Sequence, residues 1–64
     1  MDIIKVAIAD GNTLFREGLK RILAAEKDLS LAGETGDDEE VARVVERTSP
    51  DVLLLDLEIA NRKT

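Results

Sequence analysis

The chain has 64 residues, enough for one small domain, and a domain of this size buries only about 60% of the surface that its unfolded chain exposes. It contains no cysteine and no histidine, which excludes disulfides, thiolate metal sites and the usual imidazole ligand or base. The formal net charge of −5 disfavours contact with nucleic-acid phosphates, and no apolar run approaches the roughly 20 residues of a membrane span. We therefore expect a soluble cytoplasmic protein without a signal peptide, without direct nucleic-acid contact and outside the membrane.

The first two predicted elements are a strand over residues 3–10 and a helix over residues 13–26. The strand is rich in β-branched residues and ends in an Asp-Gly-Asn turn. Asn12 or Thr13 can cap the helix, because either side chain can accept a hydrogen bond from its first turn. Gly18 lies inside the helix, where we expect it to allow close packing. The helix is amphipathic, with apolar residues at Leu14, Phe15, Leu19, Ile22 and Leu23.

The next two predicted elements are a strand over residues 29–35 and a helix over residues 38–48. The strand alternates apolar residues with small or polar ones, which is typical of an edge strand. Asp37 and Glu40 have the spacing of a capping box, although aspartate replaces the usual serine or threonine. An acidic run can also form a metal site, but negative charge at a helix start favours the capping interpretation. The acidic run comprises Asp37, Asp38, Glu39 and Glu40.

The last predicted element is a strand over residues 51–57, which follows Pro50. Its run of branched aliphatic residues is typical of a strand that is buried on both faces. The run ends at a carboxylate, Asp56. A carboxylate in this position lies where ligands bind in open α/β sheets.

The order strand-helix-strand-helix-strand predicts an α/β fold with a parallel sheet. The second strand is the most polar and so belongs at an edge, which gives the strand order 2-1-3. Right-handed crossovers then place the two helices on opposite faces of the sheet. Asp10 and Asp56 lie at the ends of strands 1 and 3. The direction of the crossovers changes between these two strands, and ligands bind at such a point in open α/β sheets. We therefore expect both carboxylates to converge on one ligand-binding crevice.

Two carboxylates without histidine or cysteine suit a hard cation such as Mg²⁺, which binds through few protein oxygens, waters and substrate phosphate. Aspartate is also a nucleophile in phosphoryl transfer, which needs little more than positioning and charge neutralisation. The alternative is structural, since Asp10 and Asp56 can merely cap helices or close strands. Their convergence at the crevice favours the functional interpretation.

Three segments of the chain resemble a known family. They are IAD at residues 8–10, LFREGL at residues 14–19 and PDVLLLDL at residues 50–57. Together they resemble the first half of a response-regulator receiver domain, over about residues 3–59. The Arg-Glu-Gly-Leu sequence is similar in particular to NarL/LuxR-type transcriptional regulators. The resemblance implies a flavodoxin-like three-layer half-domain, β-α-β-α-β.

The resemblance also implies functions for individual residues. Asp56 matches the phosphoacceptor, which receives a phosphoryl group from a phosphohistidine on a sensor histidine kinase and so controls transcription. Asp10 matches one of the acidic pair that holds Mg²⁺ together with the phosphoacceptor. Glu58 matches the position whose backbone carbonyl completes the metal site.

The chain departs from the family pattern in three places. Gly11 stands where the second acid usually lies, so we expect Mg²⁺ binding to be weak or absent. The usual Met-Pro after strand 3 is Ile59-Ala60. Receivers have five strands, and we expect strands 4 and 5 and the output domain to be absent, so that residues 1–64 form a truncated receiver.

This truncation predicts self-association through the strand at residues 51–57. Without strands 4 and 5 this strand becomes a sheet edge with unpaired backbone groups, and such an edge invites pairing with another copy. We therefore expect a homodimer or higher oligomer. A two-fold dimer would pair the two strands antiparallel into one six-stranded sheet.

Two further functions compete with the signalling interpretation, under which the chain is not an enzyme. One is an interaction module that cannot be phosphorylated and only self-associates, which Gly11 and the open edge favour. The other is a fragment of a haloacid-dehalogenase-like phosphatase, because Asp56-Leu57-Glu58 resembles its Asp-x-Asp motif. That motif normally lies on the first strand, not the third. A dinucleotide-binding fold fits poorly because the first turn has no glycine-rich phosphate loop.

Overall fold

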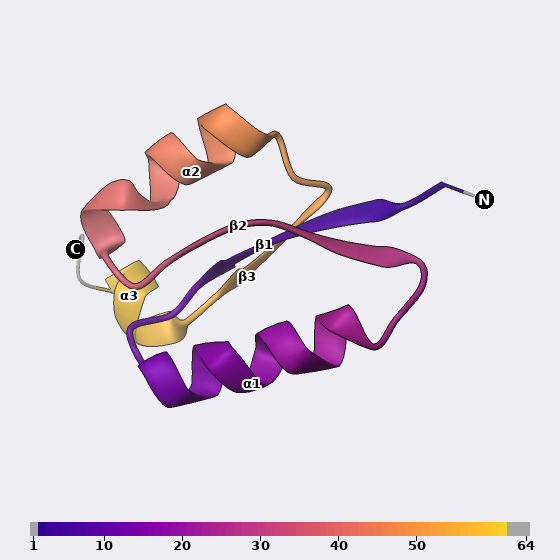
Figure 1. Cartoon of the computed structure of the whole chain (residues 1–64). Helices are drawn as coiled ribbons and strands as arrows, with labels where there is room; N and C mark the ends of the chain where they lie inside the picture. The colour runs from indigo at the N-terminus through magenta and orange to yellow at the C-terminus, as the bar shows by residue number, and fades with distance from the viewer. Residues whose placement is uncertain (1, 62–64) are drawn as a thin grey trace.

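The computed structural model describes residues 2–61 and contains a three-stranded sheet with helices on both faces (Figure 1). The two helices that cover the sheet follow strands 1 and 2, and a third, short helix follows strand 3. The elements are β1 (Ile4–Ala9), α1 (Thr13–Ala24), β2 (Leu29–Thr35), the 3₁₀ turn η1 (Asp38–Glu40), α2 (Val41–Thr48), β3 (Val52–Leu55) and α3 (Leu57–Asn61).

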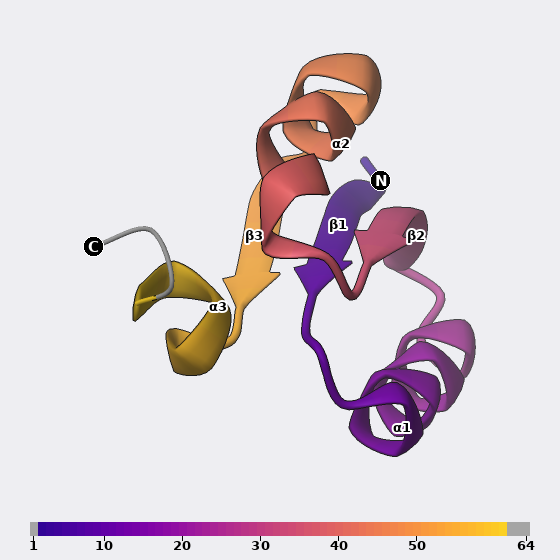
Figure 2. The ribbon, with the colours of Figure 1, turned by 90° about the vertical axis from the view of Figure 1, so that its left-hand side faces the viewer.

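The sheet is parallel and has the order β2-β1-β3, as the sequence predicted. Figure 2 shows the three strands side by side with β1 in the middle. Helices α1 and α2 lie on opposite faces (Figure 1), which confirms the expected three-layer, partial flavodoxin-like arrangement. The pairing of β1 with β2 is regular except for a shift between Val6 and Ala7, where β2 has one additional residue, Ala32.

The core on the α1 side of the sheet is built from branched aliphatic residues. Val6 and Ile8 of β1 pack with Leu23 of α1, and all three side chains are buried. Leu19 and Leu29 pack against this cluster from its edges. Strand side chains alternate between the two faces, so every second residue of β1 contributes to this core.

The opposite face, beneath α2, is built from small residues. Ala7 and Ala9 of β1 are fully buried, and Gly33 of β2 lies directly under the helix. A Cβ atom added at Gly33 would lie 3.0 Å from a methyl carbon of Thr48 and 3.1 Å from one of Val44. Small side chains on this face therefore allow α2 to lie close to the sheet.

Two helical segments, α1 and the 3₁₀ turn η1, begin with a side-chain cap. Asn12 caps α1, since its Oδ1 accepts the backbone N–H of Phe15 at 3.0 Å. Asp37 accepts the N–H of Glu39 at 2.9 Å, which confirms that this acid is a cap. The other half of the predicted capping box, a hydrogen bond from the Asp37 N–H to the Glu40 carboxylate, is wrong. The Asp37 N–H donates to the Thr35 hydroxyl, and this hydroxyl donates to the Glu40 carboxylate at 3.2 Å.

Strand β3 differs from its sequence prediction in length and burial. It spans only Val52–Leu55, and the chain enters α3 at Leu57, where we expected the strand to continue. The predicted burial on both faces is also wrong, since Val52 and Leu55 are 43% and 42% exposed. Within residues 2–61 only β1 pairs with β3, so its outer side has no neighbouring strand.

Gly18 does not have the close-packing role that the sequence predicted. Apart from its chain neighbours and the backbone of its own helix, no described residue has a heavy atom within 4 Å of the position that a Cβ atom would occupy there. The glycine faces open space on α1, beside the exposed side chains of Leu14 and Ile22.

None of the helices within residues 2–61 combines the length and the apolar composition that crossing a membrane requires.

Candidate acidic site at the carboxyl ends of the strands

The three residues that the sequence singled out line one cavity. This cavity has a volume of about 440 Å³ and lies where β1 and β3 end. Asp10 follows β1, Asp56 follows β3, and Glu58 lies in the first turn of α3. The remaining lining residues are Gly11, Asn12, Phe15 and Ile59. The predicted convergence of the two strand-end carboxylates therefore agrees with the structure.

Asp10 is held in place by several hydrogen bonds and is only 7% exposed. Its backbone N–H donates to the carbonyl oxygen of Thr35 at 3.0 Å, which continues the pairing of β1 with β2. Its carboxylate oxygen Oδ1 accepts the N–H of Asn12 at 2.8 Å. Its backbone carbonyl accepts a hydrogen bond from Nη1 of Arg16 at 2.6 Å. Both the backbone and the side chain of Asp10 are thus fixed from neighbouring elements.

Asp56 is positioned mainly through its backbone. Its N–H donates to the carbonyl oxygen of Ala9 at 2.9 Å, which places it beside the end of β1. The residue is half-buried and also borders a second cavity of about 330 Å³, formed with Phe15, Leu19 and Leu55. Glu58 is exposed, while Ile59 is buried and fixes α3 against the rest of the fold. The Asp56 carboxylate can therefore be reached from solvent.

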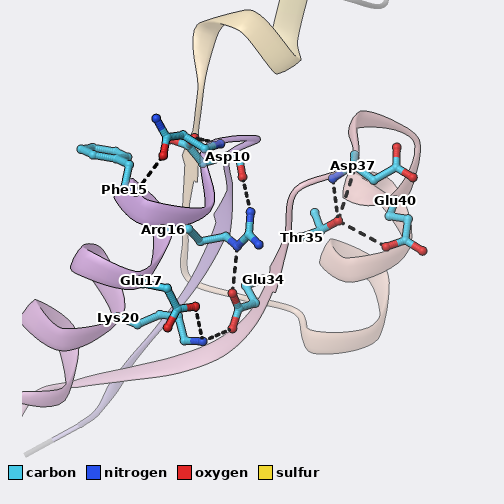
Figure 3. Close-up of polar contacts among 10 residues, drawn as sticks. Asp10, Phe15, Arg16, Glu17, Lys20, Glu34, Thr35, Asp37 and Glu40 are labelled. Atoms are coloured by element: carbon cyan, nitrogen blue, oxygen red, sulfur yellow. Dashed lines mark hydrogen bonds and ion pairs between the residues drawn. The ribbon is translucent and has the colours of Figure 1, made fainter.

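Arg16 is a residue near the site to which the sequence assigned no role. It projects from α1 between Asp10 and Glu34 of β2 (Figure 3). Its Nε donates to Oε1 of Glu34 at 3.0 Å. Lys20 donates to the other oxygen of Glu34 at 2.8 Å and to Glu17 at 3.0 Å. In the sequence, Arg16 stood out only as part of the Arg-Glu-Gly-Leu segment that resembles NarL/LuxR-type regulators.

The ion pairs around Glu34 shift the titration of two groups. The hydrogen bond from Lys20 is the main cause that lowers the pKa of Glu34, and Arg16 adds to this effect. The hydrogen bonds to Glu34 and then Glu17 raise the pKa of Lys20. Both shifts favour the charged forms, so Glu34 and Lys20 remain ionised at neutral pH.

The donor set at the cavity fits a hard cation that keeps most of its water. Asp10 and Asp56 bring carboxylate groups to the lining of the cavity, and Glu58 also lines it. In the part of the chain that the structure describes, no three acidic side chains form a metal-binding group. Gly11 lines the cavity without a carboxylate, and the expectation that any Mg²⁺ would be weakly held stays a prediction.

A parallel sheet of order 2-1-3 with an acidic cavity at the carboxyl ends of its central and third strands has the form of a partial flavodoxin-like receiver domain. Comparison with known sequences supports this class. The chain is homologous, over most of its length, to the N-terminal receiver region of NarL/LuxR-type response regulators.

Two relatives illustrate this homology. The uncharacterized transcriptional regulatory protein YxjL of Bacillus subtilis (strain 168) is 38% identical over 58 residues, which cover 91% of this chain and 27% of the relative. The transcriptional regulatory protein DegU of Brevibacillus brevis is 43% identical over 54 residues, which cover 84% of this chain and 23% of the relative. The chain therefore spans about a quarter of the length of the relatives it matches.

Some relatives are enzymes by name. The protein-glutamate methylesterase/protein-glutamine glutaminase 2 of Anaeromyxobacter dehalogenans (strain 2CP-C) is 39% identical over 54 residues, covering 84% of this chain and 16% of the relative. YxjL and DegU are transcriptional regulatory proteins by name. No family model matches the chain. No solved structure is significantly similar to it.

Proposed function

We propose that this chain is the first part of a receiver domain and that Asp56 is its phosphoacceptor. The observation that carries the proposal is the convergence of Asp10, Asp56 and Glu58 on one cavity, although β1 and β3 are far apart in the sequence. The homology to DegU and YxjL supports the same assignment. The proposed donor is a phosphohistidine on a sensor histidine kinase in the cytoplasm, and the proposed output of the whole protein is control of transcription.

In the proposed reaction, a carboxylate oxygen of Asp56 forms a bond to phosphorus as the bond between phosphorus and the imidazole nitrogen breaks. The imidazole keeps the electron pair of that bond and takes up a proton, and Asp56 becomes an acyl phosphate. Mg²⁺, held by Asp10, Asp56 and the Glu58 carbonyl, would neutralise charge on the phosphoryl oxygens. Asp10 is suited to this role because it is fixed before any ligand binds. We propose that the chain is not an enzyme in its own right.

The proposal can be tested with acetyl phosphate and Mg²⁺, followed by intact-mass and peptide mass spectrometry. We expect one phosphoryl group on Asp56, formed slowly because Gly11 supplies no second acid. Asp56→Asn should abolish the labelling. Asp28→Asn is a matched control, because Asp28 is an exposed acid that precedes β2 at the opposite end of the sheet. Labelling that persists in Asp56→Asn, or its absence from the wild-type chain, would contradict the assignment.

A second candidate function is self-association, and the exposed β3 favours it. Within residues 2–61 this strand pairs on one side only, and Val52, Leu54 and Leu55 expose between 39% and 43% of their surface. An unpaired strand with apolar side chains is a surface for pairing with another strand. We propose a two-fold homodimer in which two copies of β3 pair antiparallel.

Sedimentation velocity over a range of protein concentrations tests the dimer. We expect Leu55→Lys to shift the equilibrium to the monomer, because a charge on an edge strand opposes pairing. Leu31→Lys is the control, since Leu31 is an exposed leucine on the other edge strand, β2. A monomer at high micromolar concentration would rule out this function.

A further inference from the structure

We propose that Arg16 is a positioning residue for Asp10 and that Gly36 provides the space in which its guanidinium group lies. The functional consequence rests on the proposed role of Asp10 in holding Mg²⁺. The structural part, that Arg16 fixes the peptide after Asp10, does not depend on that role.

The first argument is the geometry of the guanidinium group. Nη1 of Arg16 donates to the backbone carbonyl of Asp10 at 2.6 Å, and Nε donates to Glu34 at 3.0 Å. The Arg16 side chain is only 17% exposed. One planar group thus connects the end of β1 to β2 from its position on α1 (Figure 3). Arginine suits this role because its donors have a fixed relative geometry that lysine lacks.

The second argument is the fixed position of Glu34, which anchors the arginine. Glu34 lies in β2 and is half-buried, and Lys20 occupies its second carboxylate oxygen at 2.8 Å. Lys20 makes no hydrogen bond to Asp10 and lies one turn further along α1. Arg16 therefore forms hydrogen bonds to both Asp10 and Glu34, whereas Lys20 contacts Glu34 but not Asp10.

The third argument is the space at Gly36. A Cβ atom added there would lie 2.6 Å from Nη1 of Arg16 and 3.4 Å from the carbonyl oxygen of Asp10. The backbone of Gly36 does not have a positive φ, so its conformation is open to any residue. Glycine is needed at this position for the space it leaves, since a methyl group would displace the guanidinium from Asp10.

The fourth argument is the residue that follows Asp10. Gly11 gives the peptide between them wide conformational freedom, because glycine has no Cβ to restrict its dihedral angles. A hydrogen bond to the carbonyl of that peptide therefore restricts the orientation of the loop that carries the Asp10 carboxylate. Loss of the bond should leave Asp10 paired to β2 through its N–H but allow its carboxylate to reorient.

The experiment compares two variants with one control in the full chain. Arg16→Ala removes the donor, and Gly36→Ala keeps the arginine and its charge but displaces the guanidinium. Lys20→Gln breaks an ion pair to the same Glu34 without touching Asp10. Circular dichroism first establishes that each variant has wild-type helix content.

The first measurement uses metal-free protein and the backbone ¹⁵N order parameters of Gly11 and Asn12. We expect rigid values of about 0.85 in the wild type and in Lys20→Gln, and values below about 0.6 in Arg16→Ala and Gly36→Ala. The order parameters of Ile8 and Val44, which are buried away from the loop, should not change. A merely structural role of Arg16 would loosen these remote positions as well.

The second measurement is a Mg²⁺ titration followed by the amide shifts of Asp10 and Gly11. We expect affinity to fall by about tenfold or more in Arg16→Ala and Gly36→Ala, as is common when a residue that orients a metal ligand is lost. It should not change in Lys20→Gln.

The two measurements separate the outcomes. Unchanged order parameters at Gly11 and Asn12 in both variants would overturn the positioning role. Loosening at these residues in a protein that shows no response to Mg²⁺ would support the positioning of Asp10 and contradict the proposed metal site. Loosening accompanied by wild-type Mg²⁺ affinity would overturn the functional part of this inference.

Discussion

The two carboxylates at the cavity are held in very different ways. Asp10 follows the central strand, is 7% exposed and has hydrogen bonds to its N–H, its carbonyl and its side chain. Asp56 follows the outer strand β3, is half-buried and is positioned by one backbone bond to Ala9. The difference matches the proposed chemistry, because a metal ligand benefits from rigidity and a phosphoacceptor must be reached by its donor.

The same contrast extends to the strands that carry these residues. The residues of β1 from Val6 to Ala9 are buried on both faces, whereas β3 leaves most of its leucines partly exposed. We therefore expect β1 to contribute more than β3 to the free energy of unfolding, and the side chains of β3 to be more accessible to solvent. We make three predictions, from the largest expected effect to the smallest, and the first of them tests this division between the strands.

The largest effect is expected from truncation of the central strand. Ile8 is fully buried within the core beside Leu23. Ile8→Ala should cost about 2–5 kcal/mol of unfolding free energy, because it removes buried methylene groups and leaves a cavity. In a domain this small such a loss is a large fraction of the total stability. Urea titration followed by circular dichroism measures it.

The matched substitution in the outer strand is Leu54→Ala. Leu54 is 39% exposed, so the same truncation should cost about 1 kcal/mol or less. Equal losses in Ile8→Ala and Leu54→Ala would break the comparison, since they would mean that β3 is covered in solution, as in the proposed dimer.

An intermediate effect is expected from supplying the missing acid. A Cβ atom at Gly11 would have no neighbour closer than 3.8 Å, and the residue has no positive φ, so the structure can accept a side chain there. Gly11→Asp should strengthen Mg²⁺ binding by about tenfold, or ~1.4 kcal/mol, because it adds a carboxylate beside the fixed Asp10. Isothermal titration calorimetry measures the change.

The control for this substitution is Gly11→Asn, which has similar size but no charge. It should leave Mg²⁺ affinity close to that of the wild type. If aspartate and asparagine act alike, the effect comes from restricting the loop and not from an added ligand.

The smallest effect is expected from pH. The pKa of Glu34 lies below its ordinary value of 4.5, chiefly because Lys20 donates a hydrogen bond to it. The stability that this carboxylate contributes is therefore present above pH 4.5 and is lost as pH falls through the lowered pKa. The difference in unfolding free energy between the wild type and Glu34→Gln should shrink on acidification from neutral pH to pH ~3.

Salt provides the check on this last prediction. The pairs around Glu34 are partly exposed, so added salt should reduce the same difference at neutral pH. A difference that stays constant on acidification would show that the side chain stabilises the fold through packing and not through its charge.

The sequence by itself determined the order of the elements and the place of the site. Apolar residues with a period of two or of 3.6, interrupted by turn residues, are local signals, and they identified all three strands and both long helices. The polar composition of the second strand then placed it at an edge, which led to the strand order and so to the meeting of Asp10 and Asp56. These inferences need no knowledge of individual contacts.

Only the tertiary structure decided which side chains meet. The bond from Arg16 to Asp10, its anchor at Glu34 and the space at Gly36 join residues up to 20 positions apart, and they depend on the additional residue in β2 that shifts its register on β1. The Thr35 hydroxyl likewise binds Glu40 in place of the predicted capping box. The burial of β3 and the surroundings of Gly18 depend on which other elements lie beside them. The apolar pattern of a segment cannot predict these neighbours, because it reflects local sequence alone.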